Sequence, residues 1–101
     1  MSLYYVQKLL YDVNRDPQRR RRFFEEPEQL LASYDLTPEE VAAFKSRDIG
    51  LLYVLGVNGQ LLMHLSAYYG MDHIAYRAAM REGVRKHGPV RAGIYAMTTE
   101  A

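Results

Sequence analysis

The segment from Asp35 to Gly56 carries the clearest local folding signals in this chain. Within it, Thr37 and Glu40 have the spacing of a capping box, in which each side chain accepts a hydrogen bond from the other residue's backbone amide. Pro38 suits the first position of a helix, where no amide hydrogen is needed. Together these residues predict a helix that begins at Pro38.

A second cap, Asp48, opens a short helix predicted at Ile49–Leu55, which Gly56 ends. This helix is apolar nearly all round its circumference, which is typical of a helix buried among other helices. We therefore expect it to be the hub around which the rest of the chain packs. The predicted core comprises Leu36, Val41, Phe44, Leu51, Leu52, Leu55, Leu61, Leu62 and Leu65.

The rest of the chain shows helical periodicity interrupted by capping residues, prolines and glycines. No strict apolar–polar alternation, tight hairpin turn or internal repeat occurs in the sequence. We expect an all-α fold, a compact orthogonal bundle of six to seven short helices at residues 1–88 with an extended C-terminal tail at 89–101. The other predicted helices are Leu3–Asn14, one that begins at Pro17, one that begins at Pro27, Asn58–Tyr69, and one from the Asp72 cap to about Lys86.

Composition narrows the class of protein. The chain has 101 residues, 49% of them apolar, which suits one globular domain with a core. Its formal net charge of +1 indicates no strong attraction to nucleic acid or to an anionic membrane. No apolar run reaches the roughly 18 residues of a transmembrane helix. We expect a soluble, cytoplasmic domain.

The residue types that carry chemistry do not form a recognisable catalytic set. The chain has no cysteine, and its three histidines lack the spacing of a zinc or iron motif. The run Arg19–Arg22 could contact phosphate, but a solvated helix surface is the favoured interpretation. We therefore expect no metal bound by this chain and no catalysis by the chain alone.

With these motifs in view, the sequence resembles the LigA-like family, the small subunits of extradiol ring-opening dioxygenases of the protocatechuate 4,5-dioxygenase type. The resemblance runs from about Tyr5 to Gly88. It rests on Arg22-Phe23, Pro27, Leu31, Tyr34, Leu36-Thr37-Pro38, Arg47-Asp48, Gly56, Asn58, Leu62, Leu65, Gly70-Met71, Tyr76 and Gly83.

The resemblance implies an all-α, noncatalytic subunit. Such a subunit packs on a larger LigB-type subunit, which holds Fe(II) through two histidines and a glutamate, and it helps to cover the substrate pocket. On this interpretation the chain binds no cofactor itself, and its partner is the catalytic subunit of a hetero-oligomer.

The candidate partner-binding or pocket-covering residues are Asn58, Tyr68, Tyr69, Met71 and His73. Four of them lie in the stretch 68–73, where aromatic and methionine side chains flank a helix-ending glycine and could anchor an interface. The alternative is that Tyr68 and Tyr69 belong to the core, because the helical period places them on the Leu65 stripe.

A second family with a similar helical shape keeps another function open. The chain also looks like the recognition domain of borosin peptide precursors, which a separate methyltransferase binds before it N-methylates the backbone of a C-terminal core. In that case the tail at 89–101 would be the modified part, and the partner would be a peptide N-methyltransferase.

Overall fold

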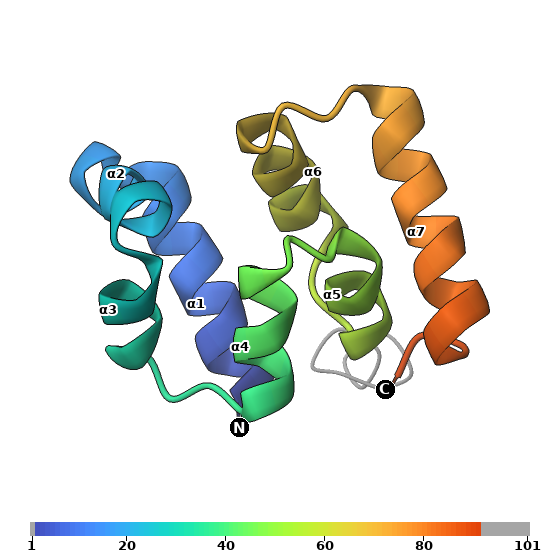
Figure 1. The fold of residues 1–101 in the computed structure, drawn as a ribbon, viewed down its shortest axis with the longest axis horizontal. Coiled ribbons are helices and arrows are strands. Elements are labelled where there is room, and N and C mark those ends of the chain that lie inside the picture. The colour runs from blue at the N-terminus through green and yellow to red at the C-terminus, as the bar shows by residue number, and fades with distance from the viewer. Residues whose placement is uncertain (1, 92–101) are drawn as a thin grey trace, which may run out of the picture.

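Seven α-helices and no strand make up the part of the chain that the structure, a computed structural model, describes: residues 2–91 (Figure 1). The predicted all-α class is therefore confirmed, and each predicted helix is present with ends shifted by a residue or two. The helices are α1 (Ser2–Arg15), α2 (Pro17–Glu25), α3 (Pro27–Ala32), α4 (Pro38–Lys45), α5 (Ile49–Leu55), α6 (Gly59–Tyr68) and α7 (His73–His87).

The predicted helix caps are formed. The Glu40 amide donates to Thr37 Oγ1 at 3.2 Å, and the Thr37 amide donates to Glu40 Oε1 at 2.8 Å, which completes the capping box of α4. The Leu51 amide donates to Asp48 Oδ1 at 3.0 Å and caps α5. Gly56 ends α5 in the left-handed conformation, with φ of 105°.

Helix α5 lies at the centre of the core, as predicted. Leu52 and Val54 are fully buried, and Leu51 and Ile49 are buried beside them. Helix α1 contributes as much to the core through a stripe of four buried side chains, a larger share than the predicted core gave it. The predicted core residues that are only partly buried are Leu36, Val41, Leu55 and Leu61, all packed against the core. The buried stripe of α1 is Val6, Leu9, Leu10 and Val13.

Two glycines allow α5 and α7 to approach closely. A Cβ atom added to Gly50 would lie 2.7 Å from Gly83 Cα and 2.9 Å from Gly83 N. Only residues without a side chain fit at both positions, and this close contact joins α7 to the hub.

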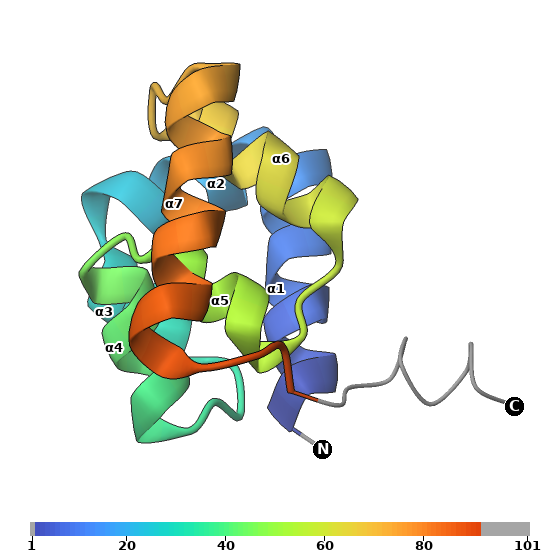
Figure 2. The same cartoon turned by 90° about the vertical axis from the view of Figure 1, so that its right-hand side faces the viewer.

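The helices are arranged with α1, α2 and α3 on one side of the molecule and α6 and α7 on the other (Figure 1). Helix α7 is the longest and lies at the edge. Figure 2 shows it crossing the front of the molecule with no other helix over it. No helix within residues 2–91 combines the length and the apolar character needed to cross a bilayer.

The chain stays in contact with the helices after α7 ends. The Arg91 amide donates to the Val54 carbonyl at 2.7 Å, and the Arg91 guanidinium pairs with Glu39 at 2.9 Å. Residues 89–91 are the start of the tail predicted at 89–101, and the rest of that predicted tail lies outside the described residues.

Candidate interaction site

The turn between α6 and α7 joins most of the predicted interface residues. Gly70 adopts a φ of 81°, which reverses the chain after Tyr69, and the Met71 amide donates to the Ser66 carbonyl at 2.9 Å. Asp72 then caps α7 by accepting from the Ala75 amide at 2.7 Å. These bonds fix the turn at both ends.

Tyr68 and Tyr69 are partly buried, and both contact neighbouring helices. The Tyr68 hydroxyl donates to Asn14 Oδ1 at 2.9 Å, and the Arg20 guanidinium lies 4.7 Å from the Tyr68 ring centroid. Tyr69 stacks on Phe23 with ring centroids 6.3 Å apart. These contacts anchor Tyr68 to α1 and Tyr69 to α2. Both residues are also partly exposed at the surface.

The other three predicted residues have different surroundings. Met71 is partly buried and packs against the core, whereas His73 is exposed at the start of α7. Asn58 caps α6 by accepting from the Gln60 and Leu61 amides at 2.9 and 3.2 Å. Asn58 therefore lies at the opposite end of α6 from the turn, and the structure brings together only four of the five predicted residues.

The arginine run is divided between internal contacts and the surface. Arg19 pairs with Asp12 at 2.6 Å, and Arg20 donates to the Val13 and Asn14 carbonyls at 3.2 and 2.9 Å. Arg21 and Arg22 are exposed. Arg19 and Arg20 therefore hold α2 against α1, which the solvated-surface interpretation did not predict, whereas Arg21 and Arg22 agree with it.

Tyr34 completes the network around Asp12. Its hydroxyl donates to Asp12 Oδ2 at 2.6 Å and accepts from Arg19 at 3.1 Å. Burial, together with the hydrogen bond to Asp12, raises the pKa of Tyr34 to about 12. This network ties the end of α3 to α1 and α2.

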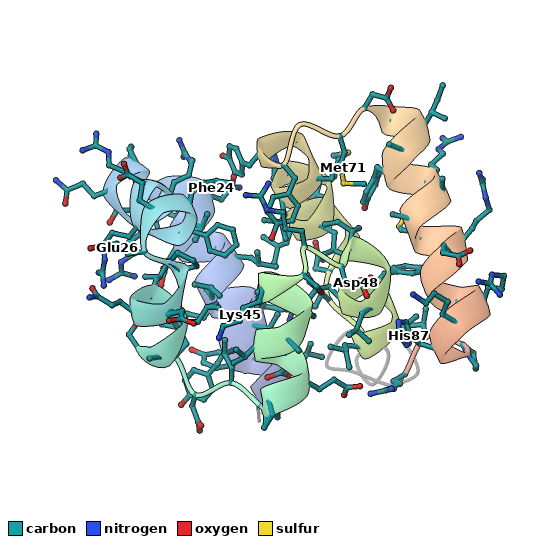
Figure 3. All side chains as sticks on the ribbon, viewed as in Figure 1. Phe24, Glu26, Lys45, Asp48, Met71 and His87 are labelled. Atoms are coloured by element: carbon teal, nitrogen blue, oxygen red, sulfur yellow. The ribbon has the colours of Figure 1, made fainter. Side chains whose placement is uncertain are left out.

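Within residues 2–91, no three His, Asp or Glu side chains gather closely enough to hold a metal ion. His64 and His73 are exposed. His87 Nε2 lies 3.7 Å from Asp48 Oδ2, so this histidine contacts the cap of α5 (Figure 3).

A cavity of about 350 Å³ opens between α2, α3 and α4. Its floor is the buried side chains of Phe23, Leu31 and Phe44, and its wall includes Phe24 and Tyr69. Figure 3 shows Phe24 at the gap between α2 and α6 and Lys45 on α4 beside α3. Three charged residues stand at the rim: Glu28, Lys45 and Arg47.

A second hollow, of about 380 Å³, lies between Tyr53 of α5 and one side of α7. Its lining mixes apolar residues with two arginines of α7: Tyr53, Met80, Val84, Arg77 and Arg81. Ile74, one turn from Arg77 on the same helix, is 77% exposed. The outer face of α7 therefore presents apolar and basic side chains together.

Comparison with known families fits this architecture. Residues 6–86 match the family described as "Aromatic-ring-opening dioxygenase LigAB, LigA subunit". The chain belongs to the LigA family. The match extends from the core stripe of α1 almost to the end of α7, so it includes the α6–α7 turn, the aromatic cavity and the outer face of α7. No curated protein matches the chain.

In this LigA-family chain, sequence reasoning missed two features: the cavity between α2, α3 and α4, and the hollow between α5 and α7. The cavity residues come from α2, α3, α4, the α4–α5 turn and the end of α6, so no spacing in the sequence links them. The α7 hollow had a partial signal, since Arg77, Arg81 and Arg85 recur every four residues beside Met80 and Val84.

Proposed function

We propose that this chain is the noncatalytic small subunit of an extradiol ring-opening dioxygenase, and that it packs on a larger LigB-type subunit and covers its active site. The observation that carries this proposal is the LigA-family match over residues 6–86. On this proposal the Fe(II) is held by the partner, and this chain contributes a surface rather than metal ligands.

The start of α7, with the turn before it, is the surface that we assign to the partner. Met71, His73 and Ile74 lie there close together in the sequence. Internal hydrogen bonds already hold the turn, so its backbone loses little conformational entropy when a partner binds. Arg77 and Arg81 extend the same face, which favours an acidic region of the partner beside an apolar contact.

Co-purification tests this proposal. The chain and a LigB-type protein encoded beside it should elute as one complex in size-exclusion chromatography, and ring cleavage by the large subunit should depend on the chain. Ile74→Glu should weaken the complex by about tenfold or more, since it places a charge at an apolar anchor. Ile74 is mostly exposed, so the variant should melt like the parent chain.

Val90→Glu is the matched control, because Val90 is an exposed apolar residue beyond the far end of α7. Its complex should be as stable as the parent complex. The proposed function would be contradicted if no complex formed. It would also be contradicted if the isolated chain bound iron tightly and cleaved the aromatic ring.

The peptide-precursor alternative depends on the predicted tail at 89–101, of which residues 92–101 lie outside the described part of the chain. It stays a prediction. Mass spectrometry of the chain after co-production with a neighbouring methyltransferase would detect backbone methylation and decide in its favour.

A further inference from the structure

We propose that the cavity between α2, α3 and α4 binds a small aromatic monocarboxylate, with Arg47 as the residue that binds the carboxylate. This site belongs to the chain alone, so it does not depend on the proposed partner.

The cavity has the form of a small-molecule site. Its volume of about 350 Å³ falls at the lower end of the roughly 300–1,000 Å³ usual for ligand pockets, which suits a ligand of one or two rings. The floor residues Phe23 and Phe44 are buried and meet edge to face, with ring centroids 5.9 Å apart. An aromatic ring entering this cavity would find further ring faces and edges to pack on.

The charge at the rim favours a single negative group. Glu28 is paired with Lys45 Nζ at 2.9 Å, so these two charges offset each other. Arg47 forms no ion pair and donates no side-chain hydrogen bond within residues 2–91. Its guanidinium lies 5.6 Å from the Phe24 ring centroid and 4.9 Å from that of Tyr69. The rings hold the guanidinium in place, and its N–H groups stay available to a carboxylate.

The backbone at Arg47 supports a role for its side chain. Arg47 is the residue outside glycine with a positive φ in the described chain, at 55°. Arg47 follows the end of α4, where the Asp48 amide donates to the Ala43 carbonyl at 2.9 Å, and glycine is the residue that adopts this conformation without strain. An arginine where glycine would end the helix with less strain is consistent with a role for its side chain at the rim of the cavity.

Tyr69, which lines the cavity, carries a second polar group behind its wall. Its hydroxyl is buried and has no hydrogen-bond partner within the described residues. Burial raises the pKa of Tyr69 to about 12, so the hydroxyl keeps its proton at neutral pH and can donate. A shift of the Tyr69 ring on ligand entry would bring this buried donor to a carboxylate oxygen, which would satisfy it.

The test is a titration of the isolated chain with benzoate and with cinnamate. Calorimetry measures the affinity, and NMR shows which residues are affected. At least one acid should bind saturably and shift the signals of Phe24, Phe44 and Tyr69. Benzamide, which keeps the ring without the charge, and cyclohexanecarboxylate, which keeps the charge without the ring, should bind at least about tenfold more weakly.

Arg47→Gly is the decisive variant, because it removes the guanidinium and also relieves the backbone strain. It should fold with an unchanged or higher melting temperature and lose binding by about tenfold or more. Arg21→Gln, which removes an exposed arginine of α2 outside the cavity, should bind like the parent chain. The proposal is overturned if neither acid binds more tightly than about 10 mM, if Arg47→Gly binds as the parent does, or if the shifted signals lie elsewhere.

Discussion

At the scale of single residues, Tyr34 and Tyr69 share a raised pKa but differ in hydrogen bonding. Tyr34 donates to Asp12, whereas the Tyr69 hydroxyl is buried with no partner in the described chain. Burial is the main cause of both shifts, and it favours the neutral phenol in the folded protein. An unpaired buried hydroxyl also costs free energy, so removing it should not weaken the fold.

The pH dependence of stability follows from these shifts. Each tyrosine has a folded pKa of about 12 against an ordinary value of 10.0. Their contribution to stability is therefore complete below about pH 10 and is lost as the pH rises through about 12. Tyr69→Phe should be as stable as the parent chain at neutral pH, and more stable above about pH 10.

Urea unfolding at neutral pH and at about pH 11 measures this difference. Tyr4→Phe, on an exposed tyrosine of α1, controls for the substitution itself. A Tyr69→Phe chain that loses stability by more than about 1 kcal/mol at neutral pH would show that its hydroxyl is hydrogen-bonded.

At the scale of elements, the contact between α5 and α7 depends on Gly50 and Gly83. A Cβ atom on Gly83 would overlap backbone atoms of Gly50, and no change of rotamer can relieve a clash with backbone. Gly83→Ala gains up to about 1 kcal/mol in helix propensity, but the helices must move apart to admit the methyl group. We expect a net loss of about 1–3 kcal/mol in the free energy of unfolding.

Gly59→Ala is the matched control for this prediction, since a Cβ atom there meets nothing within 4 Å. It should change stability by less than about 0.5 kcal/mol or increase it. Both variants are compared by urea or thermal unfolding. Equal stability of Gly83→Ala and the parent chain would mean that α5 and α7 are less closely packed than described.

Sequence reasoning predicted the helices because their signals are local. Asp16, Thr37, Asp48 and Asp72 each cap a helix through an amide two or three residues away, so spacing alone identifies them. Asn58, which was predicted to be the first residue of its helix, is also a cap in the structure. Thr37 and Glu40 even form both bonds of the predicted box.

The contacts between helices could not be predicted in the same way. The sequence marks Gly50 and Gly83 only as weak points inside helices, and their contact depends on how α5 crosses α7. Likewise, Arg47 shares a cavity with Phe24 and Tyr69 only after three helices have packed. The sequence thus points to residues that follow one turn, as at 68–73, but not to a cavity that joins distant segments.

At the scale of the whole molecule, α7 has fewer buried side chains than α1. Helix α1 buries four side chains, whereas Tyr76 and Gly83 are the buried residues of α7. Helix α7 packs mainly on α5, and Figure 2 shows its outer face uncovered. We expect amide hydrogen exchange to be faster in α7 than in α1 and α5, because little apolar burial opposes its local opening.

Exchange measured by mass spectrometry or NMR on the isolated chain tests this order. Addition of the large subunit should slow exchange in α7 and in the α6–α7 turn if they form the interface. Exchange in α7 as slow as in α5 would show that the bundle opens only as one unit.

The bond from the Arg91 amide to Val54 has a consequence for anything attached beyond it. Arg91 lies near the end of α7, so the 15 residues of that helix, about 22 Å in length, separate it from the α6–α7 turn. In Figure 1 the α6–α7 turn and Gly88, which follows α7, lie at opposite ends of that helix. A label or a fused protein attached at Arg91 needs a tether of at least about seven extended residues to reach the turn. An enzyme that bound the turn would have to span the same length to act at Arg91.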